Sequence, residues 1–183
     1  TVPATRLDEK VVRCVTPDMS AATSRNLSVQ ISKNLVDFTN SSLHFVTYES
    51  IKLDKLSVSR GPLRGGTRVT VTGSSNFVNS DVLCCNFGSV ILPAAFIDAS
   101  TVQCISPPLS KILGGQVEEK TGKSAATVNL RVSNNGQNFG ESELLFIYDY
   151  DVEISHIVPS VGIIGSVTDT VVHISGTVLP SST

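Results

Sequence analysis

The sequence predicts an all-β protein, a sandwich of short strands, and three observations support this prediction. Apolar residues alternate with polar ones in residues 68–72 and 128–133, which is the period-two pattern of a strand with one buried face. Glycine, proline, asparagine or aspartate interrupts the chain about every ten residues, a spacing typical of turns between short strands. Valine, serine and threonine are frequent, and runs of helix-forming residues are rare, so we expect no helix longer than about two turns.

The composition excludes two classes of partner. The 14 basic and 16 acidic residues give a net charge of −2, and neither sign forms a run that could grip phosphates, so we expect no nucleic acid partner. No stretch reaches the roughly 18 to 20 apolar residues of a membrane span, so we expect no direct membrane insertion in this segment. The chain begins at Thr1 without a signal-peptide pattern, and we interpret it as a mature or excised fragment.

An internal repeat organises the chain. The sequence VRCVTP at residues 12–17 returns as VQCISP at residues 102–107, which is 90 positions later. Further matches lie 101 positions apart: Val29, Ile31, Ser32, Phe38, Leu43 and Phe45 correspond to Leu130, Val132, Ser133, Phe139, Leu144 and Phe146. The two offsets, 90 and 101, differ by 11 residues, which predicts an insertion in the second copy between Pro107 and Ser124. Residues 113–122 have the composition of a loop.

A third copy begins after Tyr148. Residues 59–66 and 69–73 recur as residues 159–166 and 172–176. A period of about one hundred residues matches the size of an immunoglobulin-like sandwich, so we expect the repeating unit to be a domain. The prediction is the C-terminal half of a domain at residues 1–49, a complete domain at residues 50–149, and the N-terminal part of a third at residues 150–183.

Six short motifs in the middle copy carry a family resemblance. They are GPLRGGTRVTVTG at 61–73, NF at 76–77, CNFG at 85–88, CISPP at 104–108, VSNNG at 132–136 and FIY at 146–148. In order and spacing this copy resembles an IPT/TIG domain from end to end, and each partial copy resembles the corresponding half. The resemblance implies tandem immunoglobulin-like β-sandwich domains. Three positions depart from the family. Ser59 stands where the family usually has proline, Gly165-Ser166 stands in place of Gly-Gly, and Lys33-Asn34-Leu35 stands in place of Asn-Asn-Gly. These departures weaken the turn predictions more than the prediction of the fold.

The cysteines predict one disulfide. Leu83, Cys85 and Phe87 share one face of a predicted strand because alternate residues point to the same side, and Val102 and Cys104 share a face of another. Cys85 and Cys104 are also the positions at which the family typically has cysteine. We therefore predict a buried bridge between them, closing a loop of about twenty residues and stabilising the domain by roughly 3 kcal/mol.

Two cysteines remain. Cys14 matches Cys104 in the repeat, so we expect its partner to lie upstream of Thr1. Cys84 faces away from Cys85, and three interpretations stay open: a buried free thiol, an intermolecular bridge, or an alternative partner for Cys104. No cysteine spacing resembles a zinc site, so we expect neither a metal nor a cofactor.

Two sequons are candidates for N-glycans, Asn26-Leu27-Ser28 and Asn40-Ser41-Ser42. With ten asparagines and roughly one residue in five Ser or Thr, about two sequons are expected by accident. Of the two, Asn40 is favoured because it lies in a polar turn before a predicted strand.

No arrangement of residues predicts catalysis. His44, His156 and His173 lie at strand-like positions in different copies, without a second ligand or base at a useful spacing, and no Gly-x-Ser-x-Gly motif is present. Residues 61–66 resemble a phosphate-binding loop but lack its Lys-Ser/Thr ending and precede a strand. We interpret their glycines as turn residues that need positive φ, and expect the protein not to be an enzyme.

Asp149-Tyr150-Asp151 lies at the boundary between two copies. Carboxylates at such boundaries can bind calcium, but calcium needs more oxygen ligands than this segment supplies. The simpler interpretation is a solvated linker, with Tyr148 or Tyr150 packing against the next domain.

Together these features favour a non-enzymatic extracellular or cell-surface module. The resemblance implies a spacer and protein-binding stalk, whose protein partners, including further copies of itself, would meet strand edges or loops. Two alternatives remain: a subunit of an extracellular filament assembled from immunoglobulin-like domains, and the dimerisation domain of an intracellular transcription factor. The near-neutral charge and the predicted disulfide disfavour the transcription factor.

Overall fold

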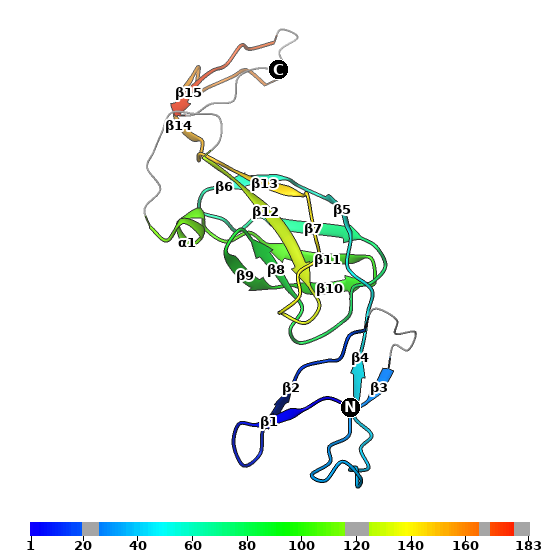
Figure 1. Cartoon of the computed structure of the whole chain (residues 1–183). Coiled ribbons are helices and arrows are strands. Elements are labelled where there is room, and N and C mark those ends of the chain that lie inside the picture. The colour runs from blue at the N-terminus through cyan, green and yellow to red at the C-terminus, as the bar shows by residue number, and fades with distance from the viewer. Residues whose placement is uncertain (20–25, 116–124, 165–168, 178–183) are drawn as a thin grey trace. The chain divides into compact units, whose positions relative to one another are not determined.

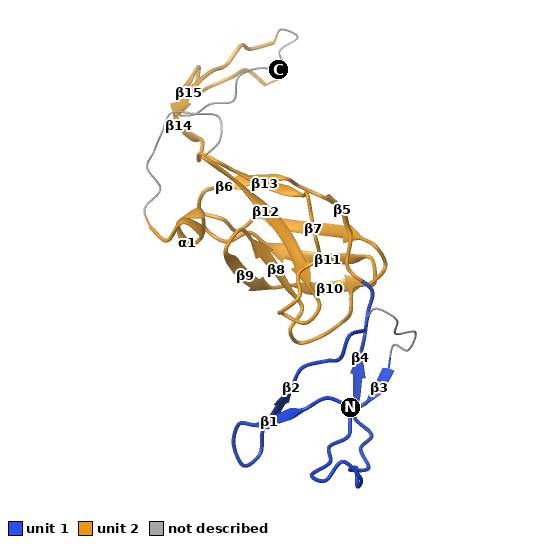
Figure 2. Ribbon diagram, in the orientation of Figure 1, with its two compact units in different colours: residues 1–49 blue, residues 50–183 orange. Residues whose placement is uncertain are grey.

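The computed structural model of the chain describes residues 1–19, 26–115, 125–164 and 169–177 (Figure 1). It divides the chain into two compact units, residues 1–49 and residues 50–183 (Figure 2). Among the described residues there are fifteen strands and one helix of five residues, which confirms the predicted all-β class.

The larger unit contains a sandwich of two sheets. The four-stranded sheet is antiparallel, in the order β10 (Ala95–Asp98), β11 (Thr101–Ile105), β7 (Arg68–Gly73) and β5 (Leu53–Leu56). The five-stranded sheet has the order β6 (Arg60–Pro62), β13 (Leu145–Asp149), β12 (Ala126–Ser133), β8 (Cys84–Phe87) and β9 (Val90–Pro93). In this sheet β6 and β13 are parallel and the other neighbours antiparallel. The chain passes from β9 to β10 through Ala94 alone, and there it changes sheet.

The inner faces of both sheets form one hydrophobic core. The alternating segments predicted as strands lie in β7 and β12, and their apolar residues are buried, Val128 only partly. Phe87, Phe146 and Tyr148 form an edge-to-face series in the middle of this core. Their ring centroids are 5.4 Å apart between Phe87 and Phe146, and 5.1 Å apart between Phe146 and Tyr148.

Strand β8 is buried on both faces. Cys85 points into the core, but Cys84 and Asn86 on the opposite side are also buried, with exposed fractions of only 6% and 7%. β8 has a strand on each side, and Cys84 is paired with Ser133 of β12 and with Pro93 of β9. An interior strand can therefore be buried on both faces even where its sequence is not continuously apolar.

The predicted insertion begins as a helical turn, which the sequence analysis did not anticipate. Helix α1 (Leu109–Leu113) ends at Gly114, which has φ +70°. Leu109 is fully buried, and the Ser89 hydroxyl donates to the carbonyl of Ile112 at 3.0 Å, so the helix is fixed to the sandwich. Residues 116–122 of the predicted loop lie outside the described residues.

The smaller unit consists of two hairpins. They are β1 (Ala4–Arg6) with β2 (Val12–Cys14), and β3 (Asn26–Ser28) with β4 (His44–Val46), both antiparallel. None of the described residues 1–19 and 26–49 is buried. A further antiparallel hairpin, β14 (Glu153–Val158) with β15 (His173–Thr177), follows the sandwich along the chain, and its described residues are not buried either.

Strand pairing in residues 1–49 repeats the pairing in the sandwich. In β3 and β4, Leu27 lies opposite Phe45. In β12 and β13, Val128 lies opposite Phe146, and both residues are 101 positions later. The offset found in the sequence is therefore also the offset of the strand register.

The turn after each of these strands repeats as well. The side-chain oxygen of Asn34 accepts a hydrogen bond from the backbone N–H of Asp37 at 2.9 Å. The side-chain oxygen of Asn135 accepts one from the backbone N–H of Asn138 at 2.8 Å. Each asparagine side chain thus closes the same Asx turn in its copy, although the first copy lacks the Asn-Asn-Gly sequence.

The C-terminal hairpin repeats the pairing of β5 with β7. The register of β5 shifts between Leu53 and Lys55, and the register of β14 shifts between Ile154 and His156, 101 positions later. An irregularity at equivalent positions shows that the two hairpins share local backbone geometry. The predicted match at residues 165–166 lies outside the described residues.

Candidate functional site

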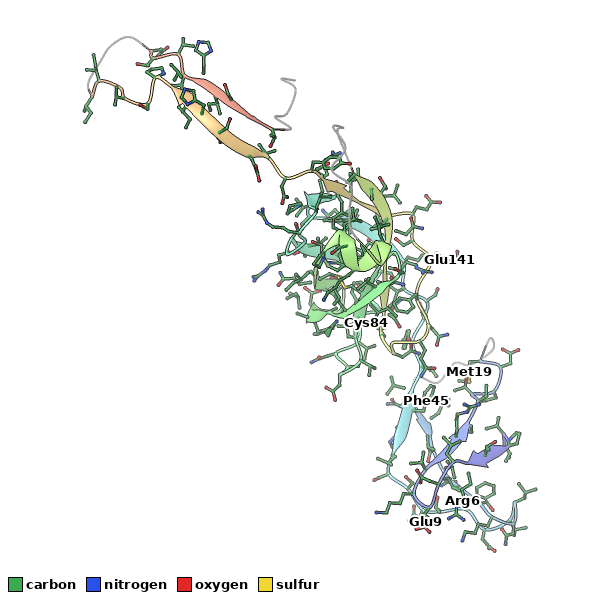
Figure 3. All side chains as sticks on the ribbon, turned by 90° about the vertical axis from the view of Figure 1, so that its left-hand side faces the viewer. Arg6, Glu9, Met19, Phe45, Cys84 and Glu141 are labelled. Carbon is green, nitrogen blue, oxygen red and sulfur yellow. A yellow bond between two sulfur atoms is a disulfide. The ribbon has the colours of Figure 1, made fainter. Side chains whose placement is uncertain are left out.

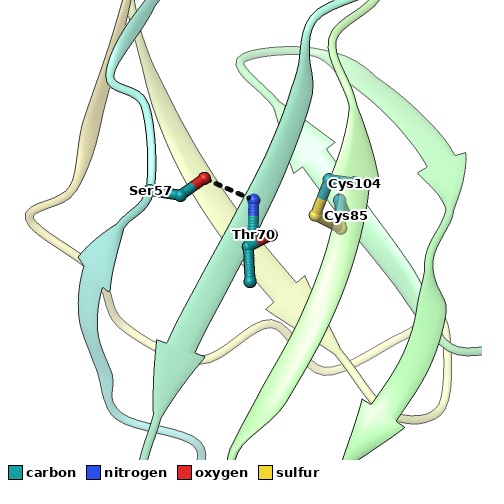
Figure 4. The surroundings of a disulfide bond; sticks show 4 residues. All are labelled: Ser57, Thr70, Cys85 and Cys104. Carbon is teal, nitrogen blue, oxygen red and sulfur yellow. Dashed lines mark hydrogen bonds between the residues drawn. A yellow bond between two sulfur atoms is a disulfide. The ribbon is translucent and has the colours of Figure 1, made fainter.

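A disulfide joins the two sheets of the sandwich. Cys85 of β8 and Cys104 of β11 are bonded, their Cα atoms are 6.1 Å apart, and both residues are fully buried (Figure 4). The bond links the five-stranded sheet to the four-stranded sheet, so it is an intersheet bridge. In the four-stranded sheet, the Ser57 hydroxyl accepts a hydrogen bond from the backbone N–H of Thr70 at 2.9 Å and extends the pairing of the edge strand.

The other two cysteines are free thiols in different environments. Cys84, labelled in Figure 3, is buried next to Cys85 in β8, and this burial raises the pKa of its thiol. Cys14 is exposed on β2. Its pair partner on β1 is Ala4, and the Cys14 side chain lines a shallow apolar depression with Val2 and Val15.

Tyr148 belongs to the core of its own domain. Sequence reasoning allowed it to pack against a following domain, and the structure shows that this was wrong. Its side chain is fully buried, and its hydroxyl donates a hydrogen bond to the carbonyl of Pro107 at 2.7 Å. Burial raises the pKa of Tyr148 to about 12, a shift that a hydrogen bond with Ser106 opposes. This tyrosine anchors the end of β13 to the segment after β11.

The glycine-rich segment 61–66 packs against that same segment. Gly65 and Gly66 have φ of +74° and +83°, as predicted for turn residues. The reason for Gly61 is different: a side chain there would collide with Thr67 and Phe146. The loop is held by its backbone, because the N–H of Gly66 donates to the Ser106 carbonyl at 2.8 Å. Close packing therefore requires glycine at position 61, and positive φ favours it at positions 65 and 66.

The carboxylates at the end of the sandwich face arginines. Arg60 binds both carboxylate oxygens of Asp149, with Nε 2.8 Å from Oδ2, and Asp149 raises the pKa of Arg60 further. Arg64 lies 3.4 Å from Asp151. No group of three or more His, Cys, Asp or Glu residues forms a metal-binding cluster within the described parts of the chain. Sequence reasoning missed both arginines, although Arg60 directly precedes the glycine-rich segment and Arg64 lies within it.

The remaining candidate residues lie on the surface. His44, His156 and His173 are exposed strand residues, as expected for solvated histidines. Asn26 begins β3 and Asn40 lies between β3 and β4, and both are exposed. Of the helices in the described ranges, none has the length and apolar character needed to cross a membrane.

The free strand edges are the surfaces at which the sandwich could meet a protein. They are β5 and β10 in the four-stranded sheet, and β6 and β9 in the five-stranded sheet. Each edge strand has backbone hydrogen-bonding groups on its outer side that no further strand of the same sheet pairs. This geometry can bind an added strand.

Comparison with known proteins places this geometry in context. Residues 52–148 match the family model of the IPT/TIG domain. Plexin-A3 of Rattus norvegicus is 30% identical over 146 residues, covering 77% of this chain and 7% of that protein. Plexin-A3 of Homo sapiens is 31% identical over 143 residues, with the same coverage. The chain thus spans only a small fraction of the curated relatives that it matches.

Two solved structures of the plexin A4 extracellular region are also similar. One is 25% identical, with a TM-score of 0.45, and the match covers 65% of this chain and 9% of that chain. The other is 23% identical, with a TM-score of 0.40, and the match covers 59% of this chain and 9% of that chain.

Proposed function

Because this chain belongs to the IPT/TIG domain family, we propose that it is a non-enzymatic structural segment of the extracellular region of a cell-surface receptor. In this role its domains space the parts of the receptor and present surfaces to protein partners. The similarity to plexin-A3 over 77% of the chain favours this function over an extracellular filament or a transcription factor.

One observation carries the proposal: the chain repeats its strand register and its turn hydrogen bonds at equivalent positions. Pairs 101 positions apart occupy equivalent positions in β3–β4 and β12–β13, and again in β5 and β14. We infer tandem domains from this repetition: residues 1–49 as the C-terminal half of one, residues 50–149 as a complete domain, and residues 150–183 as the start of a third. A row of such domains separates its two ends by a set distance, which is the property of a spacer.

The disulfide supports an extracellular location. Bonds such as Cys85–Cys104 persist in oxidising compartments and are rare in the cytosol, where a transcription factor would be made. A buried bridge between sheets adds stability that does not depend on ligand binding. Cys14, equivalent to Cys104, would bond a cysteine in the other half of its own domain.

The chemistry of the described residues supports a non-enzymatic role. The histidines are exposed, His44 on the β3–β4 hairpin and His156 and His173 on the β14–β15 hairpin, and the thiol of Cys84 is buried. The acidic pair Asp149 and Asp151 is engaged by arginines. The domain presents the edges and outer faces of its sheets. We therefore expect protein partners, including other copies of the chain. We expect neither a nucleic acid partner nor a cofactor.

The test is secretion of the full chain from eukaryotic cells, followed by two measurements. Peptide mapping with and without reductant should find Cys85 linked to Cys104. Limited proteolysis should leave a protected fragment close to residues 50–149, because this part alone has a closed core. Free thiols at both positions in the secreted protein, or a protected fragment with unrelated boundaries, would contradict the proposal.

A second measurement separates the spacer from the filament. Electron microscopy of the intact parent protein should show single rods whose length shortens when residues 50–149 are deleted. Regular polymers would support the filament instead. As a matched control, Cys85→Ser with Cys104→Ser should lower the stability of the rod domain without changing whether polymers form.

A further inference from the structure

We propose that unit 1 carries two N-linked glycans, at Asn26 and Asn40, both on the side of the unit that faces solvent when its domain is complete. The proposal rests on the extracellular function above, because the glycan is attached only in the secretory pathway. Chance alone could supply two sequons. The proposal therefore rests on the positions at which the strand register places the side chains of both sequons.

Strand parity places the first sequon on the outer face of β3. Asn26 and Ser28 are exposed, and Leu27 between them is half-buried. Alternate residues of a strand point to the same side, so the acceptor amide and the hydroxyl two positions later lie on one face. Leu27 is opposite Phe45 and belongs to the other face.

The middle domain shows which of these faces becomes the core. Leu27 corresponds to Val128, which packs against the hydrophobic core, and Phe45 corresponds to Phe146, which is fully buried. Asn26 corresponds to Thr127, which is exposed. Completing the domain of unit 1 would therefore bury the Leu27 face and leave Asn26 in solvent.

The same comparison applies to the second sequon. Asn40 corresponds to Glu141, and Ser42 corresponds to Glu143, both of which are exposed in the complete domain (Figure 3). The local backbone is also equivalent. Ser41 accepts a hydrogen bond from the N–H of Leu43 at 3.1 Å, just as Ser142 accepts one from Leu144 at 3.0 Å. Asn40 thus occupies a position that the domain leaves open to solvent.

Both sequons meet the accessibility that glycan transfer requires. The transfer needs an asparagine and a hydroxyl residue that folding leaves open to solvent. Here the acceptor and the hydroxyl residue of both sequons correspond to exposed positions of the complete domain, at Thr127, Asn129, Glu141 and Glu143. The middle domain has no sequon at these positions, so the glycans would distinguish the two copies.

The reaction needs one co-reactant, a lipid-linked oligosaccharide diphosphate of the secretory pathway. The side-chain amide nitrogen of asparagine forms a bond to the anomeric carbon of the first sugar. The bond from that carbon to the diphosphate oxygen breaks, and the lipid diphosphate leaves with the electron pair. One amide proton is released, and no oxidation occurs. The product is a neutral, bulky and strongly hydrated group on the surface.

The experiment uses the full chain secreted from mammalian cells. Enzymatic removal of N-glycans in heavy-oxygen water converts each occupied asparagine to labelled aspartate, which peptide mass spectrometry locates. We expect label at both Asn26 and Asn40. On a gel, removal of the glycans should shift the natural sequence by two glycan masses and Asn26→Gln or Asn40→Gln by one. The double variant should not shift. Ser28→Ala and Ser42→Ala remove the same glycans while keeping the asparagines, so they act as matched controls.

A transplanted sequon tests the register itself. Thr127→Asn with Asn129→Ser recreates the first sequon at the equivalent outer position of the middle domain, and should add a third glycan. Secreted protein with an intact Cys85–Cys104 bridge but no label at Asn26 and Asn40 would overturn this proposal and leave the extracellular function standing. Label at one site alone would overturn the assignment of the other. Failure of the extracellular function itself would appear differently, as reduced cysteines in the secreted chain.

Discussion

The middle domain and unit 1 share a backbone pattern but differ in burial. Phe146 and Phe45 occupy the same place in the strand register, yet Phe146 is fully buried and Phe45 is 44% exposed. The same holds for Leu130, fully buried, and Val29, 43% exposed. Local sequence is therefore enough to set the pairing and the turn, whereas burial needs a second sheet. An isolated two-stranded hairpin in water is at best marginally stable, so we expect unit 1 of this chain to exchange its amide hydrogens much faster than the sandwich.

The largest difference should appear when the equivalent phenylalanines are truncated. Phe146→Ala leaves a cavity in a closed core and should lower the free energy of unfolding of the sandwich by about 3 to 5 kcal/mol. Phe45→Ala removes a side chain that is already in contact with water, and should change the free energy of unfolding of the sandwich by less than about 0.5 kcal/mol. Chemical denaturation monitored by tyrosine circular dichroism measures both. Equal effects would mean that the two units do not differ as described.

The disulfide should produce the next largest effect. Cys85→Ala with Cys104→Ala opens a loop with a sequence separation of 19 residues and should lower the free energy of unfolding by roughly 3 kcal/mol. Cys14→Ala is the control from unit 1 and should leave the denaturation midpoint of the sandwich unchanged. A midpoint that moves equally in both variants would contradict the intersheet role of the bridge.

Tyr148 adds a pH dependence that unit 1 cannot share, because Thr47 stands at the equivalent position. The folded pKa of about 12 lies above the ordinary value of 10, so the neutral phenol stabilises the fold fully below pH 10. This stability is lost as the pH rises through 12. Tyr148→Phe should lower the free energy of unfolding at neutral pH by about 1 to 2 kcal/mol, because the Pro107 carbonyl loses its donor.

Melting temperatures measured between neutral pH and pH 12 would check this dependence. The alkaline decline should be smaller in Tyr148→Phe than in the natural sequence. If the melting temperatures of both proteins fell equally at high pH, the loss of stability would come from titrating groups other than Tyr148.

The smallest effect concerns the repeated turn. Leu35 has φ +63°, a conformation that costs a residue with a Cβ about 1 to 2 kcal/mol, and its counterpart Gly136 has φ +70° without that cost. Gly136→Ala should therefore destabilise the sandwich by about 1 kcal/mol, and Leu35→Gly should slow hydrogen exchange of the Thr39 amide, which bonds to the Ile31 carbonyl. Faster exchange of the Thr39 amide in Leu35→Gly would show that the positive φ of Leu35 does not limit the stability of this turn.

Much of the architecture could be predicted from the sequence, because it depends on local patterns. Period-two alternation identified β7 and β12, and the motif spacing identified the family that the IPT/TIG match confirms. The repeat offsets were visible because strand register and turn geometry are encoded by nearby residues. These features need no knowledge of which strands become neighbours.

The features that were missed depend on contacts between distant segments. Sequence reasoning left a buried Cys84 as only one of three interpretations, because the sequence of β8 does not reveal that this strand lies between β12 and β9. Sequence reasoning allowed Tyr148 to pack against a following domain because its actual partner, Pro107, is 41 residues away. The pair of Arg60 with Asp149 spans 89 residues, and only the parallel pairing of β6 with β13 brings them together.

That parallel pairing has a consequence for a segment held under tension. The chain reaches β6 shortly after entering the domain, and it leaves the domain from β13. Pulling the two ends apart would drag these neighbouring strands past each other in opposite directions, so their hydrogen bonds would be loaded together and not one after another. The ion pair of Arg60 with Asp149 lies across the same seam. A row of such domains would transmit force along the chain while each domain stayed folded.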